Sequence, residues 1–373
     1  MSLSASELDR YSRHLSLAEI GRAGQERLRA ARVLVVGAGG LGSPAALYLA
    51  AAGVGVLGIV DGDRVERSNL QRQVLFGESD IGQPKAVVAS GRLHALNREI
   101  SVVAHAHELS PDNARSLIGS YDIVIDGTDR TAARYLINDA CVILGKPLVS
   151  AAIHRFEGHA ITYLPGRGPC YRCLFPDATA ASAASCAEAG VLGVLPGVLG
   201  TIQATEAIKV VLGVGEPLLG RLLTYDALEM CFREFPVSRR LDCAVCGSAP
   251  RIVSLEDQSE RGAAVRRIAP GELEQLIRAA DRGGGAIRLI DVREPAEFAA
   301  GHLPNAESIP LDVLDRDPRP LLGPGLTVFI CRSGTRSLRA CEIAVRRGLL
   351  EPAHLEGGLS AWAAIVDPTL RVA

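Results

Sequence analysis

The stretch Gly37-Ala38-Gly39-Gly40-Leu41-Gly42 decides the expected fold of the first part of this chain. It follows an apolar run, Val33 to Val36, and opens an alanine-rich segment with helical character. Glycines at a strand-to-helix turn let backbone N–H groups and the helix dipole face a phosphate, because a side chain there would block the approach. The stretch therefore predicts a strand, a phosphate-binding loop and a helix of a parallel α/β sheet.

Similar apolar runs alternate with helical stretches beyond this loop. They occur at Val33 to Val36, Gly58 to Val60, Ser101 to Ala104, Ile123 to Ile125 and Leu148 to Ser150. That alternation is typical of a mainly parallel sheet covered by helices on both faces, so we expect a Rossmann-like α/β domain over residues 1–247. Residues 248–269 are polar and lack sustained periodicity, which predicts a linker. A smaller α/β domain is expected over residues 270–373.

Charge and composition exclude some classes of partner. A formal net charge of -2 gives no electrostatic reason to expect nucleic acid or an anionic membrane. The uncharged stretch from Val33 to Val60 is long enough to span a bilayer. Seven glycines and Pro44 interrupt it, however, which favours strand, loop, helix and strand. The polar segment Met1 to Arg13 predicts no signal peptide, so we expect a cytoplasmic protein with no membrane partner.

The glycine loop by itself does not decide which nucleotide the first domain binds. Asp61 ends the next expected strand, where its carboxylate can accept hydrogen bonds from ribose hydroxyls, as in an NAD-dependent oxidoreductase. Asn69, Arg72 and Lys85 come after that strand. A triphosphate requires more cations than a pyrophosphate, and an additional Arg and Lys suit that need. Taken in isolation, the same residues would also fit a solvated polar loop.

The string from Asp61 to Lys85, together with Arg10-Tyr11-Ser12-Arg13, resembles the MoeB/ThiF family, the bacterial relatives of ubiquitin-activating enzymes, over Leu8 to Gly247. The resemblance implies ATP and Mg²⁺ as ligands and a homodimer in which Arg13 reaches the partner's ATP phosphates. It assigns the other nucleotide contacts to Gly37, Gly39, Gly40, Gly42, Asp61, Asn69, Arg72, Lys85 and Asp129, with Asp129 on the magnesium side. The structural alternative for Asp126 and Asp129 is capping of the next helix.

The implied reaction explains these residue types. A carboxylate resists nucleophiles because it is anionic and would have to expel oxide, whereas an acyl adenylate expels AMP. The domain therefore has to align the carboxylate with the α-phosphorus and neutralise charge, for which Arg72, Lys85 and Mg²⁺ suffice. No general base is required for this step.

Two pairs of the nine cysteines have metal-ligand spacing. Cys170-Tyr171-Arg172-Cys173 and Cys243-Ala244-Val245-Cys246 are C-x-x-C pairs suited to a closed tetrahedral Zn²⁺ site. Their separation exceeds the usual spacing of about 15–20 residues, so the spacing alone leaves a redox-active pair open. The MoeB-like resemblance implies that all four cysteines bind a structural zinc.

Cys186 lies in an Ala/Ser-rich segment, in Ser185-Cys186-Ala187-Glu188-Ala189-Gly190. A free cysteine is more often a small buried apolar residue than a nucleophile. The Cys-x-Glu-x-Gly string of the resembled family, in contrast, holds a cysteine that bonds transiently to the activated carrier. Both interpretations stay open for Cys186, and we assign Cys141, Cys231 and Cys341 to packing.

In the second domain, Asp291 to Leu303 and Glu356 to Trp362 resemble the two signature stretches of rhodanese sulfurtransferases. Between them, Cys331-Arg332-Ser333-Gly334-Thr335-Arg336 follows a strand and precedes a helix, so backbone N–H groups should converge on the sulfur of Cys331. Arg332 and Arg336 would add positive charge around a persulfide. A phosphatase can use a similar cysteine cradle, but the six-residue loop is typical of sulfur transfer.

Both halves together resemble fused adenylyltransferase and sulfurtransferase proteins of molybdenum-cofactor synthesis and tRNA thiolation. The resemblance implies that a ubiquitin-like, MoaD/ThiS-like sulfur carrier ending in Gly-Gly is adenylated and then attacked by a Cys331 persulfide. Cys186 would assist the reductive cleavage that leaves a carrier thiocarboxylate, and a donor such as a cysteine desulfurase would supply sulfur. The alternatives are an NAD-dependent oxidoreductase and a non-catalytic scaffold that docks carrier proteins.

Overall fold

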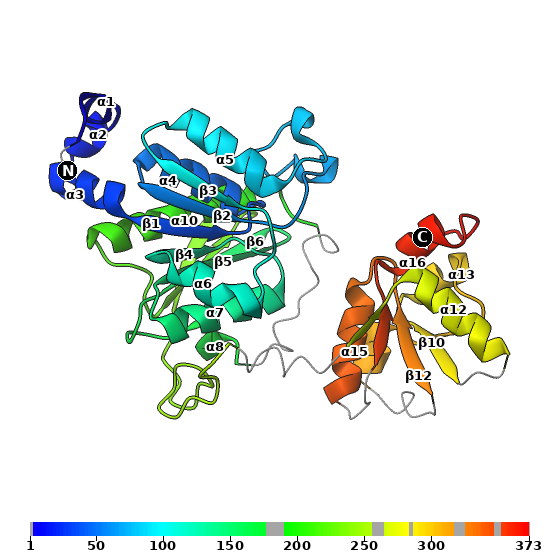
Figure 1. The fold of residues 1–373 in the computed structure, drawn as a ribbon. Helices are drawn as coiled ribbons and strands as arrows, with labels where there is room; N and C mark the ends of the chain where they lie inside the picture. The colour runs from blue at the N-terminus through cyan, green and yellow to red at the C-terminus, as the bar shows by residue number, and fades with distance from the viewer. Residues whose placement is uncertain are drawn as a thin grey trace. The chain divides into compact units, whose positions relative to one another are not determined.

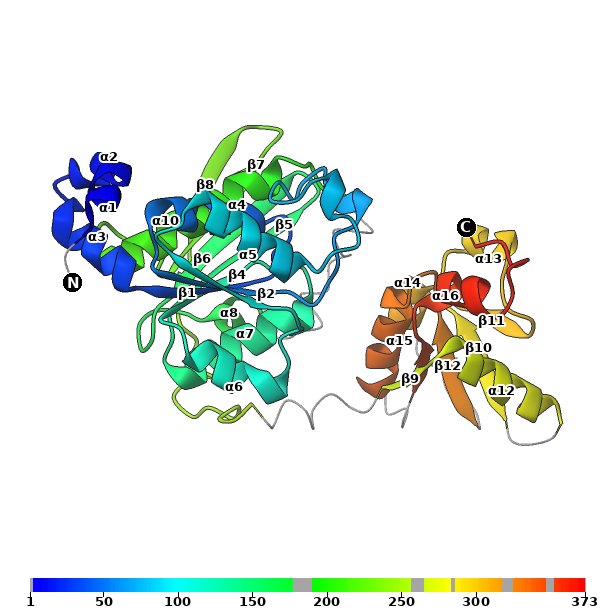
Figure 2. The same cartoon turned by 45° about the horizontal axis from the view of Figure 1, so that its top comes forward.

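The computed structural model of this chain describes residues 3–176, 190–255, 265–282, 286–316, 325–346 and 352–372. The chain divides into two compact units, Met1–Gln258 and Ser259–Ala373 (Figures 1 and 2). The expected linker, residues 248–269, spans this boundary, and its residues 256–264 lie outside the described part. Each unit has its own sheet and its own helices.

The first unit is built on an eight-stranded sheet in the order β3-β2-β1-β4-β5-β6-β7-β8. Its first five strands in the chain are parallel to one another, and the last three extend the sheet as antiparallel neighbours. Their bounds are Arg32–Val36 (β1), Val56–Val60 (β2), Ser101–His105 (β3), Ile123–Asp126 (β4), Leu148–His154 (β5), Glu157–Tyr163 (β6), Arg221–Asp226 (β7) and Cys231–Pro236 (β8). The expected mainly parallel α/β fold and its five parallel strands are confirmed.

Helices cover both faces of this sheet because successive strand side chains point to opposite sides. Val33 and Val35 of β1 pack in one core, and Leu34 and Val36 pack in the other. The helices are α1 (Ala5–Arg10), α2 (Ser12–Leu15), α3 (Gly21–Ala30), α4 (Gly42–Ala52), α5 (Lys85–Leu96), α6 (Pro111–Gly119), α7 (Thr131–Leu144), α8 (Tyr171–Leu174) and α10 (Leu195–Leu212). Figures 1 and 2 show α4, α5 and α10 on one face and α6 and α7 on the other.

Helix α10, Leu195–Leu212, is an 18-residue apolar helix. By length and composition alone, this is the one helix among the described residues that could cross a membrane. Leu195, Leu199, Ala204 and Ala207 on it are buried in the cores that it shares with α4 and the sheet. Its apolar character is therefore accounted for by packing within the first unit.

The second unit has a five-stranded parallel sheet in the order β11-β10-β12-β13-β9. Its strands are Arg266–Ile268 (β9), Ile287–Asp291 (β10), Ala306–Ser308 (β11), Leu326–Ile330 (β12) and Ala353–Leu355 (β13). Its helices are α12 (Pro270–Asp281), α13 (Pro295–Ala300), α14 (Leu311–Arg316), α15 (Thr335–Arg346) and α16 (Gly358–Ile365). The expected α/β class is confirmed, while β9 forms from residues that we expected in the linker, since Ile268 is fully buried against the sheet.

Candidate functional site

The glycine loop connects β1 to α4 and packs against the turn after β4. Gly37 has a φ of +91°, and a Cβ on it would lie 2.8 Å from the carbonyl oxygen of Gly127. A Cβ on Gly42 would overlap the carbonyl oxygen of Gly37. By contrast, the nearest atom to a Cβ on Gly39 would be Gln73 Nε2, at the ordinary contact distance of 3.5 Å. The loop thus needs Gly37 and Gly42 for its own folding, whereas Gly39 leaves open space for a ligand.

Asp61 links the end of β2 to this loop. Its Oδ2 accepts a hydrogen bond from the N–H of Ala38 at 2.8 Å, and its Oδ1 accepts one from the N–H of Asp63 at 2.8 Å. Burial raises the pKa of the Asp61 carboxyl above its usual value, and the positive charge of Lys85 opposes that rise. Asp61 therefore fixes the loop and also lines the cavity beside it.

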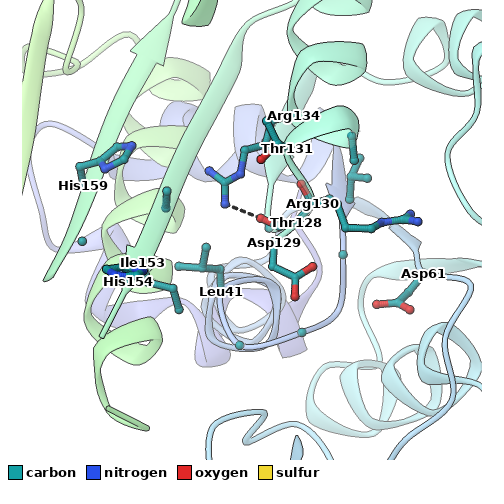
Figure 3. Close-up of a pocket in the computed structure, with 18 of the residues that line it drawn as sticks. Leu41, Asp61, Thr128, Asp129, Arg130, Thr131, Arg134, Ile153, His154 and His159 are labelled. Atoms are coloured by element: carbon teal, nitrogen blue, oxygen red, sulfur yellow. Dashed lines mark hydrogen bonds between the residues drawn. The ribbon is translucent and has the colours of Figure 1, made fainter. Parts of the chain in front are cut away.

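A cavity of about 600 Å³ lies at the carboxyl ends of the parallel strands and continues along β6 and β7. This is the edge of an open α/β sheet where ligands bind, and the volume is within the range of about 300–1,000 Å³ for ligand sites. The structure brings the following sequence-predicted residues into its lining: Gly37, Gly39, Gly40, Asp61, Arg72, Lys85 and Asp129. Figure 3 shows Asp61, Asp129 and Arg134 projecting from three different elements around it.

Among the residues that the structure describes, five Lys and Arg residues line the cavity, and three of them, Lys85, Arg72 and Arg134, come from different segments of the chain. Lys85 begins α5, is buried, and places its Nζ 2.9 Å from Asp63 Oδ2. Arg72 donates from Nη1 to the carbonyl oxygen of Ser68 at 3.0 Å. Arg134 of α7 donates to the carbonyl oxygens of Ala151 and Thr128, which holds its guanidinium against the turn that contains Asp129. The cavity combines these cations with the carboxylates of Asp61 and Asp129, a set suited to a phosphate chain with a metal ion.

Sequence patterns did not single out the part of the cavity formed by the antiparallel strands. His159 of β6 and Asp226 at the end of β7 line it together with Arg134. Burial, aided by the nearby charge of Arg134, lowers the pKa of His159 to about 4, so this imidazole is neutral at neutral pH. The available signal for β6 was weak: polar Glu157 and His159 alternate with small Gly158 and Ala160 before the β-favouring residues Ile161 to Tyr163.

Three predicted nucleotide contacts are not among the described residues that line the cavity: Gly42, Asn69 and Arg13. Gly42 lies behind the loop, where it is needed for close packing. Asn69 is buried, and its Oδ1 accepts a hydrogen bond from the N–H of Glu66 at 3.3 Å. Arg13 is exposed on α2. The roles of Asn69 and Arg13 toward ATP stay predictions.

Both C-x-x-C pairs meet in one buried cluster. The sulfurs of Cys170, Cys173, Cys243 and Cys246 all lie within 4.8 Å of one another. The Cys170–Cys243 and Cys173–Cys246 sulfur distances are 3.7 Å and 3.4 Å, close to the separation of about 3.8 Å in a tetrahedron with Zn–S bonds of about 2.3 Å. Burial raises the pKa of the Cys246 thiol to about 11, and a bound cation would offset this effect by stabilising the thiolate. The four thiols fit a bound Zn²⁺.

Cys186 lies outside the described residues.

The second unit encloses the sulfur of Cys331, as expected. Cys331 comes directly after β12 and is fully buried. Its Sγ accepts hydrogen bonds from the N–H groups of Gly334 at 3.1 Å and Ser337 at 3.3 Å. Gly334 has a φ of +96°, which allows the loop to curl around the sulfur. This arrangement favours negative charge on the sulfur because backbone donors and the start of α15 both face it.

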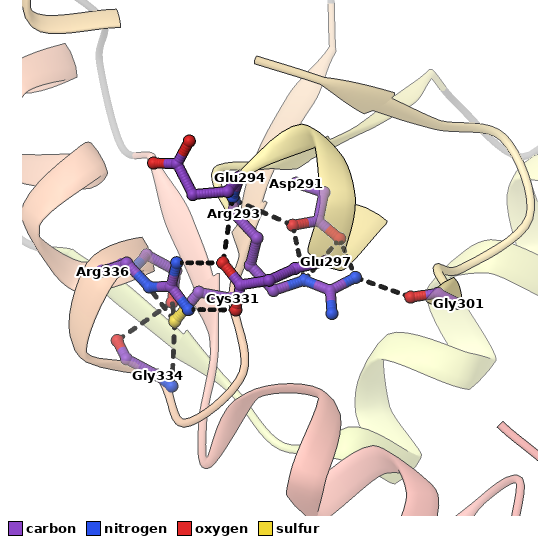
Figure 4. A network of polar contacts seen from close by, with 9 residues as sticks. Asp291, Arg293, Glu294, Glu297, Gly301, Cys331, Gly334 and Arg336 are labelled. Carbon is purple, nitrogen blue, oxygen red and sulfur yellow. Dashed lines mark hydrogen bonds and ion pairs between the residues drawn. The ribbon is translucent and has the colours of Figure 1, made fainter. Parts of the chain in front are cut away.

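The two loop arginines differ in their surroundings. Arg332 is exposed. Arg336 forms a two-bond ion pair with Glu297 of α13, at 2.6 and 2.7 Å (Figure 4). This pairing lowers the pKa of Glu297 to about 2. Beside it, Arg293 and Asp291 form an ion pair whose side chains are fully buried. The positive charge of Arg336 is thus already balanced by a carboxylate that the sequence alone did not connect to it.

The chain is similar to known proteins over nearly its whole length. The model of the ThiF family matches residues 11–245, and that of the rhodanese-like domain matches residues 270–365. The probable adenylyltransferase/sulfurtransferase MoeZ of Mycobacterium tuberculosis is 42% identical, with 99% of this chain and 96% of that protein aligned. The adenylyltransferase and sulfurtransferase MOCS3 of Sus scrofa is 43% identical, with coverages of 99% and 88%. The crystal structure of E. coli MccB with ATP has a TM-score of 0.57 at 27% identity, covering 65% of this chain and 75% of that one.

Proposed function

Because this chain belongs to the ThiF family and contains a rhodanese-like domain, we propose that it is an adenylyltransferase and sulfurtransferase that activates a small sulfur-carrier protein. One observation carries the proposal beyond the family: a single chain holds both a nucleotide-sized cavity lined by Asp61, Arg72, Lys85 and Asp129 and a cysteine sulfur cradled by backbone N–H groups. These are the two sites that activation and sulfur transfer require.

In the first step, the C-terminal carboxylate of a ubiquitin-like carrier attacks the α-phosphorus of ATP, and pyrophosphate leaves. Arg72 and Lys85 balance the charge of the phosphates, and the open space at Gly39 lets them approach the loop. Asp129 would hold Mg²⁺, which supplies further positive charge at the phosphates. The part of the cavity along β6 and β7 would take the Gly-Gly tail, since glycines leave room beside His159 and Asp226.

In the second step, the terminal sulfur of a Cys331 persulfide attacks the acyl adenylate and AMP leaves, which gives an acyl disulfide on Cys331. Two electrons are then needed to release the thiocarboxylate. We assign this step to the Cys186 thiolate: it attacks the Cys331 sulfur of the acyl disulfide, the S–S bond breaks, the carrier thiocarboxylate leaves, and a Cys186–Cys331 disulfide forms. An external thiol reductant then supplies two electrons and returns both cysteines to thiols. A persulfide donor such as a cysteine desulfurase recharges Cys331.

Four further assignments belong to the same proposal: the zinc site, the location, the oligomeric state and the role of Arg13. The cluster of Cys170, Cys173, Cys243 and Cys246 holds one structural Zn²⁺, which joins two segments far apart in the sequence. The protein acts in the cytoplasm as a homodimer. Arg13, exposed on α2, reaches the ATP phosphates of the partner subunit.

The test is a reconstituted reaction with a purified Gly-Gly carrier, ATP, Mg²⁺, thiosulfate and a thiol reductant. The carrier mass should increase by the replacement of one carboxylate oxygen by sulfur, and pyrophosphate exchange into ATP should require the carrier. Exchange with no thiocarboxylate would remove sulfur transfer from the proposal. Binding of NAD(H) with no carrier-dependent exchange would favour the oxidoreductase, and carrier binding with neither reaction would favour the scaffold.

A further inference from the structure

A buried line of polar side chains continues beyond the sulfur of Cys331. Ser337, in the first turn of α15, has its Oγ 3.5 Å from Cys331 Sγ. On its other side, the same Oγ is 3.5 Å from Nδ1 of His354 on the neighbouring strand β13. Cys331 and Ser337 are fully buried, and His354 is 5% exposed. Sulfur transfer as proposed above uses the backbone N–H of Ser337 but gives no role to the side chain of Ser337 or of His354.

The hydrogen-bonding capacity of Ser337 fixes the role of His354. A serine hydroxyl donates one hydrogen bond and accepts two. Ser337 Oγ lies 3.0 Å from the carbonyl oxygen of Gly334, which can only accept, so the hydroxyl hydrogen points there at rest. Nδ1 of His354 must then be the donor to Ser337 Oγ. A protonated Cys331 thiol would donate to the remaining lone pair.

The surroundings of Nε2, the other ring nitrogen of His354, also favour a proton on Nδ1. Nε2 is buried and has no hydrogen-bond partner among the described residues. With the proton on Nδ1, Nε2 is a buried acceptor, whereas the opposite tautomer would bury an N–H group with no acceptor, which proteins rarely tolerate. The proton on Nδ1 is therefore the favourable arrangement.

The charged groups around His354 keep its ring neutral. Burial lowers the pKa of His354, and Arg267 of the adjacent strand β9 lowers it further by repulsion. The charge of Glu356 and a backbone hydrogen bond at Leu355 oppose these effects. Ser337 of α15 faces its Nδ1, and Cys331, directly after β12, lies on the other side of the Ser337 hydroxyl. At neutral pH, His354 thus acts through a hydrogen bond rather than through a positive charge.

We propose that His354 is a positioning residue for the Ser337 hydroxyl. Its Nδ1–H holds Ser337 Oγ beside the sulfur, and the hydroxyl hydrogen turns from the Gly334 carbonyl to Cys331 Sγ once that sulfur carries negative charge. The anionic sulfur then receives three hydrogen bonds, two from the N–H groups of Gly334 and Ser337 and one from the hydroxyl. No bond between heavy atoms changes in this step. The inference rests on the proposed role of Cys331 as the sulfur-carrying thiol.

The test measures the alkylation of Cys331 by iodoacetamide against pH in the full-length protein, with the Cys331 peptide quantified by mass spectrometry. Ser337→Ala should move the midpoint of this profile up by about one pH unit, a tenfold loss of anionic sulfur at a fixed lower pH. His354→Gln should move it in the same direction by about half as much. His354→Asn should leave it near the wild-type midpoint, because the amide nitrogen of asparagine takes the place of Nδ1.

Two comparisons separate positioning from general damage. Adding His354→Gln to the Ser337→Ala variant should not move the midpoint further, because Ser337→Ala already removes the hydrogen bond between Ser337 and His354. Thr327→Val, which removes another buried hydroxyl on β12, should leave the midpoint where it is. Equal midpoints for His354→Asn and His354→Gln, or additive effects of the two substitutions, would overturn the proposal. Alkylation needs no sulfur donor and no carrier, so these outcomes are independent of whether sulfur transfer itself succeeds.

Discussion

Replacing Lys85 by methionine tests whether the cavity catalyses adenylation. Lys85 begins α5, and its side chain is 7% exposed, while its partner Asp63 is 66% exposed. Methionine keeps most of the buried stem and removes only the charge. Because Asp63 remains in water, the lost ion pair should cost about 1 kcal/mol or less in the free energy of unfolding. Removal of a donor used in the transition state should cost about 2.7–4 kcal/mol, or about 10²–10³-fold in the rate of ATP–pyrophosphate exchange.

Lys209→Met provides a matched control with the opposite expectation. Lys209 of α10 pairs with Glu206, whose side chain is 4% exposed, and it does not line the cavity. Glu206 keeps hydrogen bonds from Thr162 Oγ1 and the N–H of Leu218, so we expect a loss of about 1–3 kcal/mol rather than the larger cost of an isolated buried charge. The melting temperature should fall by about 2–4 °C per kcal/mol.

The assay compares carrier-dependent pyrophosphate exchange with thermal unfolding for both variants. Lys85→Met should lose exchange while its melting temperature changes little, and Lys209→Met should lose stability while exchange stays near the wild-type rate. If Lys85→Met kept its rate within about threefold of wild type, far from the loss expected for a transition-state donor, its assignment to the phosphates would be wrong. A parallel loss of rate and stability in both variants would also refute the reasoning.

The remaining predictions concern the other sites. Cys331→Ala should abolish thiosulfate-to-cyanide transfer and thiocarboxylate formation but leave pyrophosphate exchange intact. Asp129→Ala should abolish pyrophosphate exchange, and with it thiocarboxylate formation, but leave thiosulfate-to-cyanide transfer intact. Sulfur mapped by mass spectrometry to a cysteine other than Cys331 would contradict this. Metal analysis of reduced protein should find one zinc per chain. Chelation should destabilise the first unit, since structural zinc contributes on the order of 10 kcal/mol to folding. Cys231→Ser, a substitution outside the cluster, should change neither the zinc content nor the stability. The Glu297–Arg336 pair lowers the pKa of Glu297 to about 2, so its contribution to stability is present above the ordinary carboxyl range near 4.5 and is lost as the pH falls through about 2. Unfolding midpoints against pH should show this loss in wild type but not in Glu297→Gln, and identical curves would rule out the contribution.

The sequence predicted the parts of the first unit whose structure depends on local residue patterns. Five parallel strands followed from apolar runs, and the loop from Gly37 to Gly42 followed from the need for a side-chain-free turn. Strand β6 was missed because Glu157–Tyr163 mixes small, polar and apolar residues and is stabilised by two neighbours, β5 and β7. With β6 missed, the half of the cavity that contains His159 could not be anticipated.

Local sequence patterns also could not predict ion pairs between segments that lie far apart in the chain. Motif spacing identified Arg336 as a charge near the sulfur, but its partner Glu297 comes from α13, on a different part of the chain. The register that places β10 beside β12 brings these segments together, and short-range patterns carry no information about that pairing.

This pairing changes what the loop arginines do for the sulfur. If both acted freely, the loop would present two positive charges and should bind a dianionic sulfur donor strongly. With Glu297 balancing Arg336, the positive charge near Cys331 comes mainly from the exposed Arg332 and from the N–H groups of Gly334 and Ser337. Those backbone donors lie within hydrogen-bond distance of the sulfur itself, so they act on whatever charge the sulfur carries, regardless of the donor that delivered it. The loop is therefore organised around stabilising negative charge on the Cys331 sulfur more than around capturing an anion from solution.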